Sequence, residues 1–184
     1  MKKHFVLTVI GPDHPGIVGR LSATLSHHQA SWLDSRMANL AGEFAGILHG
    51  EVPSQQFPAL LQDLMKLRDE DVQIVVREPS PSALAGPNQR HLALEVVGTD
   101  RTGIVRDISA VLSQFAVNVE EMSTTFGEAP MSAAPIFRTT ARLSAALQID
   151  LEALQTALET IANDLMIELR VEPSPGRGSD ANAT

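Results

Sequence analysis

The stretch Gly11 to Val18 (GPDHPGIV) occurs twice in the chain, because Gly98 to Val105 (GTDRTGIV) repeats it 87 positions further along. Five of the eight residue types are identical: the two glycines, the aspartate, the isoleucine and the valine. The same offset relates the alternating apolar residues before each copy and the apolar residues spaced by four after it. An offset that holds across a strand pattern, a turn and a helix pattern indicates an internal repeat. We therefore expect two copies of one supersecondary unit.

Each copy of the turn has residues suited to joining a strand to a helix. Gly11 and Gly98 can take the positive φ that reverses a strand sharply. Asp13 and Asp100 are good N-cap residues, and Pro15 suits a first helical turn. The turn therefore predicts a capped helix start in both copies.

The second glycine of each turn indicates a ligand site. Gly16 and Gly103 leave the backbone bare at the helix start, where unpaired N–H groups and the helix dipole can receive a carboxylate or a phosphate. The competing interpretation is a strand-to-helix turn without a ligand, since short glycine motifs often match by chance.

Composition excludes several classes of protein. The chain has 184 residues, 43% of them hydrophobic, and it contains no cysteine, so disulfides and cysteine metal sites are excluded. The net charge of −8 opposes non-specific binding to nucleic acid, which needs a basic face. No apolar run approaches the length of a membrane span, and residues 1–10 form no signal peptide. We expect a soluble cytoplasmic protein.

Hydrophobic periodicity gives the order β-α-β-β-α-β twice. In the first unit the strands are expected at 4–10, 30–39, 43–52 and 72–77, and the helices at 16–28 and from 53–54 to 67. In the second unit the strands are expected at 92–97, 117–125, 136–143 and 167–171, the helices at 103–115 and 151–161, and a long loop at 127–135. The predicted domains are 1–78 and 90–172, with a Pro/Gly/Ser-rich linker at 79–89 and a disordered tail at 173–184.

This order predicts an α+β fold made of two ferredoxin-like units, each an antiparallel sheet with both helices on one face. Units of this size have only modest cores. The opposite face of the first strands is mixed, with Val6, Thr8 and Ile10 in one unit and Ala93, Glu95 and Val97 in the other. Pairing of the two units, or of two chains in a homodimer, would cover it.

The two βαββαβ units and their Gly-x-Asp-x-x-Gly-Ile-Val turns resemble tandem ACT domains and the effector-binding turn of that family. The resemblance extends over residues 4–172. It implies an amino-acid-sensing regulator of transcription in bacterial glycine catabolism. It further implies glycine as the effector and, as the protein partner, a DNA-binding activator of the glycine cleavage genes. A detached sensor subunit that regulates a metabolic enzyme is the alternative.

The resemblance also implies the ligand-binding residues. Ser31 and Asn118 stand where the second strand of the family carries a polar residue that faces the turn, and Asn118 makes the second unit the better candidate. The candidate ligand-binding residues are Asp13, His14, Gly16, Ile17 and Ser31 in the first unit, and Asp100, Arg101, Gly103, Ile104 and Asn118 in the second.

No catalytic pattern is found in the sequence, so we expect neither an enzyme nor a cofactor or metal. His27 and His28 are adjacent and should point about 100° apart on a helix, which argues against a shared metal. Asp69 to Asp71 is interpreted as a solvated loop.

Overall fold

The computed structural model of the chain describes residues 1–67, 72–79, 89–128, 135–161 and 165–172. The chain divides into two compact units, Met1–Ala85 (unit 1) and Gly86–Thr184 (unit 2). The middle of the predicted linker, the acidic stretch 69–71, residues 129–134 of the predicted loop and the predicted tail lie outside the described residues. The predicted domain boundaries therefore stay predictions.

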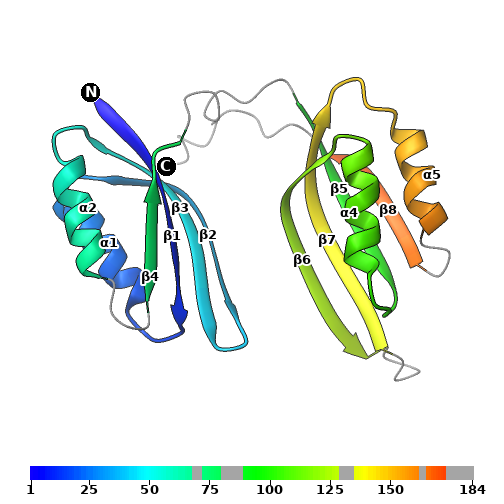
Figure 1. Cartoon of the computed structure of the whole chain (residues 1–184), viewed down its shortest axis with the longest axis horizontal. Helices are drawn as coiled ribbons and strands as arrows, with labels where there is room; N and C mark the ends of the chain where they lie inside the picture. Colours follow the sequence, from blue (N-terminus) through cyan, green and yellow to red (C-terminus); the bar gives the residue numbers. More distant parts are fainter. Residues whose placement is uncertain (68–71, 80–88, 129–134, 162–164, 173–184) are drawn as a thin grey trace, which may run out of the picture. The chain divides into compact units, whose positions relative to one another are not determined.

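Unit 1 has a four-stranded antiparallel sheet in the order β2-β3-β1-β4. Both helices lie on one side of this sheet, as the βαββαβ order predicts (Figure 1). The elements are β1 (Lys2–Pro12), α1 (Ile17–His27), β2 (Ser31–Leu40), β3 (Glu43–Pro53), α2 (Phe57–Lys66) and β4 (Gln73–Arg77).

Unit 2 repeats the plan, with the sheet order β6-β7-β5-β8 and its two helices again on one side (Figure 1). Its elements are β5 (Gln89–Thr99), α4 (Ile104–Gln114), β6 (Asn118–Glu128), β7 (Pro135–Ala146), α5 (Leu151–Ile161) and β8 (Leu165–Glu172). The predicted fold class, two ferredoxin-like α+β units, is confirmed. None of the described helices is both long and apolar enough to cross a membrane.

Alternation along the first strand of each unit builds the core. Every second residue faces the helices and is buried, while its neighbours face the other side of the sheet. Burying one such Leu or Val side chain contributes about 1.5–3 kcal/mol. The strand residues buried in this way are Phe5, Leu7 and Val9 in β1, and Leu92, Leu94 and Val96 in β5.

A glycine makes room for the largest of these side chains. Gly50 of β3 pairs with Phe5 of β1, and a Cβ atom at Gly50 would lie 2.5 Å from Cζ of Phe5. The matching pair in unit 2 is Leu92 with Leu143, both fully buried. The two cores therefore fill the same space with different pairs of side chains.

Two predicted boundaries are wrong. Helix α2 begins at Phe57 and not near Ser54, because the Ser54 backbone N–H donates to the Met1 carbonyl at 3.1 Å and holds this residue in a turn. Strands β6 and β7 extend into the predicted loop, since Gly127 pairs with Ile136 and Glu128 with Pro135.

Candidate functional site

The turn of unit 1 starts its helix with a glycine and not with the predicted aspartate. Gly16 is the N-cap of α1, with φ of 106° in the left-handed region and no side-chain cap. Asp13 instead joins the turn to the β2–β3 hairpin: its N–H donates to the Gly42 carbonyl at 2.8 Å, and its carboxylate accepts from Asn39. Gly11 lies in β1 opposite Phe44 and makes no reversal. The predicted N-cap role of Asp13 and the predicted reversal at Gly11 are therefore wrong, because the chain turns later, at Gly16.

The start of α1 is open. Among the described residues, no atom beyond Gly16 and its chain neighbours lies within 4 Å of the position that a Cβ at Gly16 would take. The first N–H groups of a helix have no acceptor within the helix, so they can donate hydrogen bonds to a bound anion. Ile17, the next residue, is buried in the core, and the exposed ring of His14 donates from Nδ1 to the Pro15 carbonyl at 3.3 Å. The turn thus exposes backbone while Ile17 anchors it.

The turn of unit 2 has the same backbone. Gly103 is the N-cap of α4 with φ of 94° and no side-chain cap, so Asp100 is not the predicted N-cap. Gly98 lies in β5, paired with Phe137 and Leu165, and does not have the positive φ predicted for it. Ile104 is buried as Ile17 is. Both turns therefore follow one rule: the reversal falls on the second glycine, not on the first.

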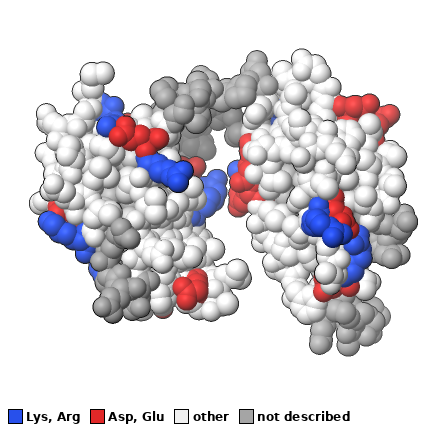
Figure 2. Space-filling view, viewed as in Figure 1, with Lys and Arg blue, Asp and Glu red and all other residues white. Residues whose placement is uncertain are grey.

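Charged side chains distinguish the turn of unit 2. Arg101 Nη1 donates to Asp107 Oδ2 at 2.9 Å, and its Nη2 donates to the Ile161 carbonyl at 3.0 Å. Arg106 donates to the other oxygen of Asp107 at 2.9 Å and lies 3.2 Å from a Cβ position at Gly103. Oppositely charged side chains lie side by side over α4 in Figure 2. The helix start thus has two guanidinium groups beside it.

These guanidinium groups also fix the charge of their partner. The hydrogen bonds from Arg101 and then Arg106 hold the pKa of the Asp107 carboxyl below its ordinary value. Asp107 therefore stays ionised and orients both arginines at neutral pH.

Ser31 and Asn118 do not face the turns of their own units. Ser31 pairs with Glu51, which pairs with His4 near the start of β1, whereas the turn follows Pro12 at the other end. Since a strand rises about 3.4 Å per residue, Ser31 lies ~27 Å along the sheet from the turn. Asn118 is placed in the same way, level with His91 and remote from Gly103. The prediction that these residues face their own turns is wrong, because β2 and β6 begin where the preceding helix ends.

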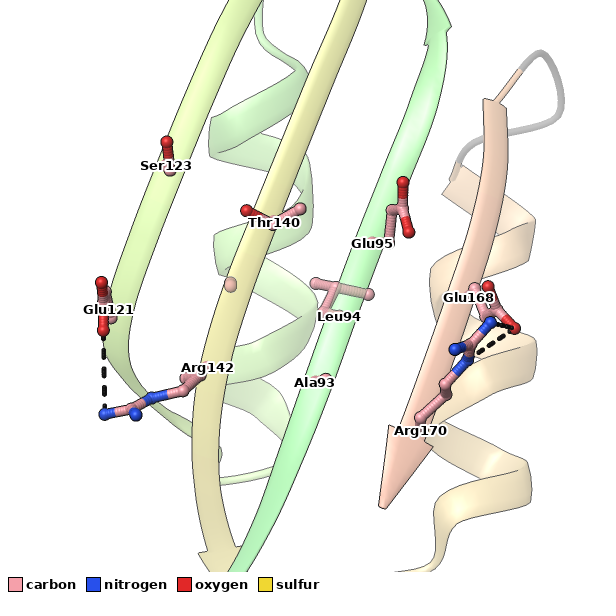
Figure 3. Close-up of a pocket in the computed structure, with 10 residues that line it drawn as sticks. Ala93, Leu94, Glu95, Glu121, Ser123, Thr140, Arg142, Glu168 and Arg170 are labelled. Carbon is pink, nitrogen blue, oxygen red and sulfur yellow. Dashed lines mark hydrogen bonds and ion pairs between the residues drawn. The ribbon is translucent and has the colours of Figure 1, made fainter. Parts of the chain in front are cut away.

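A groove that the sequence analysis missed lies on the helix-free face of unit 2. Its cavity volume is about 270 Å³. Ala93 of β5 and Thr140 of β7 lie between the ion pairs Glu121–Arg142 and Glu168–Arg170, and Ser123 lies on the edge strand β6 with Glu121 (Figure 3). Part of the signal was present in the sequence, because Ala93 and Thr140 alternate with core residues of β5 and β7.

A second group that the sequence analysis missed joins the two helices of unit 1. One ring nitrogen each of His27 and His28 and a carboxylate oxygen of Asp63 lie within 4.8 Å of one another. The prediction that the adjacent histidines cannot approach one metal is wrong in its geometry. His28 is the C-cap of α1, with φ of −95° and ψ of 15°, and so departs from the regular helical spacing.

Comparison with known proteins identifies the first unit. Residues 3–77 match the family model of the ACT domain. This match confirms, for unit 1, the resemblance to ACT domains seen in the turn, and unit 2 repeats the topology of unit 1. No curated protein matches the chain in sequence.

Two solved structures match nearly the whole chain. The first is an unknown protein from Galdieria sulphuraria, 29% identical with a TM-score of 0.79; the match covers 94% of this chain and 100% of that one. The second is described as a "putative glycine cleavage system transcriptional repressor", 18% identical with a TM-score of 0.69, and here the match covers 95% of this chain and 99% of that one. The second likeness shows the fold alone. Both matches extend over unit 1 and unit 2 of this chain.

Proposed function

We propose that this chain is an amino-acid-sensing regulatory protein without catalytic activity, which acts as a transcriptional repressor in glycine catabolism. The observation that carries the proposal is the repeated turn, in which a left-handed glycine opens the start of an amphipathic helix in both units. The match of residues 3–77 to the ACT domain supports a regulatory role. The likeness in fold to the protein described as a glycine cleavage repressor supports the particular pathway.

The effector that we propose is glycine or another small amino acid. Its carboxylate would accept from the first N–H groups of the helix, where the helix dipole favours an anion. Its ammonium group needs an acceptor, and each turn carries an aspartate three residues before the glycine, Asp13 in unit 1 and Asp100 in unit 2. The turn thus offers partners for both charged groups of an amino acid.

We propose the turn of unit 2 as the stronger site. Arg101 and Arg106 lie beside its helix start, held by Asp107, and a charge-assisted bond to a carboxylate is stronger than a neutral one. In unit 1 the matching positions are His14 and Gly19. The anion site of unit 2 therefore has two guanidinium groups, those of Arg101 and Arg106, which these positions do not supply in unit 1.

The output that we propose passes through protein contact and not through DNA. The net charge of −8 disfavours a phosphate backbone, which needs Lys and Arg on one face. The proposed partner is a DNA-binding activator of the glycine cleavage genes, and a homodimer of the chain is compatible with the same role.

A thermal-shift screen against the twenty amino acids tests effector binding, because a ligand that binds only the native state raises its apparent stability. Glycine is expected to raise the melting temperature in a concentration-dependent way. No shift with any amino acid would contradict the proposal.

Affinity capture from the native cytoplasm, with and without the effector, tests the output. A DNA-binding activator among the captured proteins would support the proposal. Capture of a metabolic enzyme would favour a detached sensor subunit.

A further inference from the structure

The histidine cluster of unit 1 lies where the end of α1 meets α2. His27 is the last residue of α1 and is exposed, whereas His28, the next residue, is buried with 5% of its surface accessible. Asp63 lies on the facing side of α2 with a partly buried side chain. Among the described residues, this is the group of His, Asp and Glu side chains whose ligand atoms converge to within 4.8 Å.

The ring of His28 has the orientation of a metal ligand. Its Nε2 lies 2.8 Å from Oδ2 of Asp63, and its Nδ1 lies 3.5 Å from Oε1 of Gln56. A histidine that ligates a metal typically donates its other ring N–H to an oxygen, which fixes the tautomer. Gln56 supplies such an oxygen: with Nδ1–H directed at Gln56, Nε2 would present its lone pair to a metal between it and Asp63, whereas without a metal Nε2–H donates to Oδ2 of Asp63.

We propose that His27, His28 and Asp63 form a binding site for a divalent transition metal, with Zn²⁺ as the fitting ion. Two imidazole nitrogens and one carboxylate oxygen are ligands that zinc accepts, with water completing a four-coordinate site. Ligand bonds of about 2.0–2.1 Å place neighbouring tetrahedral ligands ~3.3 Å apart. The His28–Asp63 pair at 2.8 Å would open slightly, and the exposed His27 ring would rotate inward.

The C-terminal end of α1 favours a cation here. The C-terminal end of α1 carries the negative end of the helix dipole, and both histidines stand at that end. Lys66 binds Oδ1 of Asp63 at 2.7 Å, so the other oxygen, Oδ2, remains directed at His28.

The simpler alternative is that His28 and Asp63 form a hydrogen bond that joins α1 to α2 without a metal. In that case His27, which is exposed on the last turn of α1, has no part in the cluster. A substitution of His27 therefore distinguishes the two interpretations, since it leaves the hydrogen bond between His28 and Asp63 intact.

The test is calorimetric titration of Zn²⁺ into the metal-free, untagged full chain, with His27→Ala and, as the control, His91→Ala, whose histidine lies in unit 2 beside Glu120. We expect one Zn²⁺ per chain for the wild type and for His91→Ala. His27→Ala should bind at least about tenfold more weakly, since even outer-shell changes at metal sites cost 10–100-fold. Circular dichroism should show that both variants are folded.

Titration with Co²⁺ adds a readout of the coordination itself. A tetrahedral site should give intense visible absorption in the wild type that is lost in His27→Ala. Saturable Zn²⁺ binding that is equal in wild type and His27→Ala, or no saturable binding in the wild type, would overturn the proposal.

Discussion

On the helix-free faces of the two units the strands pair in the same register, but the exposed side chains are mainly apolar in unit 1 and polar or charged in unit 2. In unit 1 the central row of this face is Thr8 of β1, flanked by Ile47 and Val75, which are about half exposed. In unit 2 the matching row is Glu95 of β5, flanked by Thr140 and Glu168. The inward residues of the two units are apolar at the same positions, so the core preserves the repeated fold while the outer face is free to diverge.

The turns differ in the same sense. Both use a left-handed glycine as the N-cap, yet Gly16 is open and Gly103 lies under Arg106. Asp107, which orients the arginines of unit 2, corresponds to Arg20 in unit 1. One backbone therefore carries two sites with different charged side chains, and the two units are expected to differ in ligand binding.

The largest expected effect concerns how the two cores fill the same space. Gly50→Ala places a methyl group 2.5 Å from Phe5, which is fully buried, so it should lower the free energy of unfolding by about 1–3 kcal/mol. Gly127→Ala is the control, since no atom of the described residues beyond its chain neighbours lies within 4 Å of its Cβ position, and it should change stability by less than ~0.5 kcal/mol. Urea unfolding followed by circular dichroism measures both, and equal losses would contradict the packing described.

The second prediction tests whether the two turns share one conformation. Gly16→Ala and Gly103→Ala should each cost about 1–2 kcal/mol, because both residues have positive φ, which strains an L side chain. The contact to Arg106 adds little, since that side chain can move. Chemical unfolding of the two variants gives the comparison, and a variant of unchanged stability would show that its turn is not left-handed.

The third prediction concerns the carboxylate of Asp107 in unit 2, which unit 1 replaces with Arg20. The pKa of Asp107 is lowered in the folded state, so its contribution to stability is present above its ordinary value of 3.8 and is lost as the pH falls through the lowered pKa. Asp107→Asn should therefore reduce the melting temperature at neutral pH, and the difference should fade in acid. A difference that is constant from neutral pH to strong acid would contradict the arginine pairing.

The smallest effect is expected on the charged face of unit 2. Arg142→Ala removes an ion pair to Glu121 at 3.7 Å whose two side chains are about half exposed, and such pairs contribute about 0–1 kcal/mol. Ile47→Ala on the apolar face of unit 1 is the companion variant. Thermal unfolding of both should show only small changes, and a loss above ~2 kcal/mol in either would mean that the face is covered in solution.

Most of the fold was predictable from the pattern of apolar residues. Leu7 and Leu94 belong to alternating apolar residues that mark strands, and Leu21 belongs to apolar residues spaced by three and four that mark a helix. The turn chemistry was less so: Asp13 and Asp100 have the composition of N-caps, but a left-handed glycine three residues later starts each helix. Sequence alone does not show which of two glycines takes the positive φ.

The site was harder to predict than the fold because it depends on strand direction. Ser31 and Asn118 appear close to their turns in the sequence, yet an intervening helix carries the chain back to the opposite end of the sheet. The approach of His28 to Asp63 depends on how α1 and α2 pack, which no local pattern encodes. Arg101 and Arg106 flank the turn in the sequence, but only the helical geometry shows that both donate to Asp107.

The central claim is that the turn of unit 2 binds a small amino acid, and calorimetric titration of glycine into wild type, Gly103→Val and Gly16→Val tests it most directly. The valine at 103 blocks access to the helix amides, and a lost hydrogen bond to a charged group costs about 1.5–3 kcal/mol, or more than tenfold in affinity. We predict saturable binding to the wild type, at least tenfold weaker binding to folded Gly103→Val, and binding retained in Gly16→Val. No binding to the wild type, or full affinity in Gly103→Val, would contradict the account.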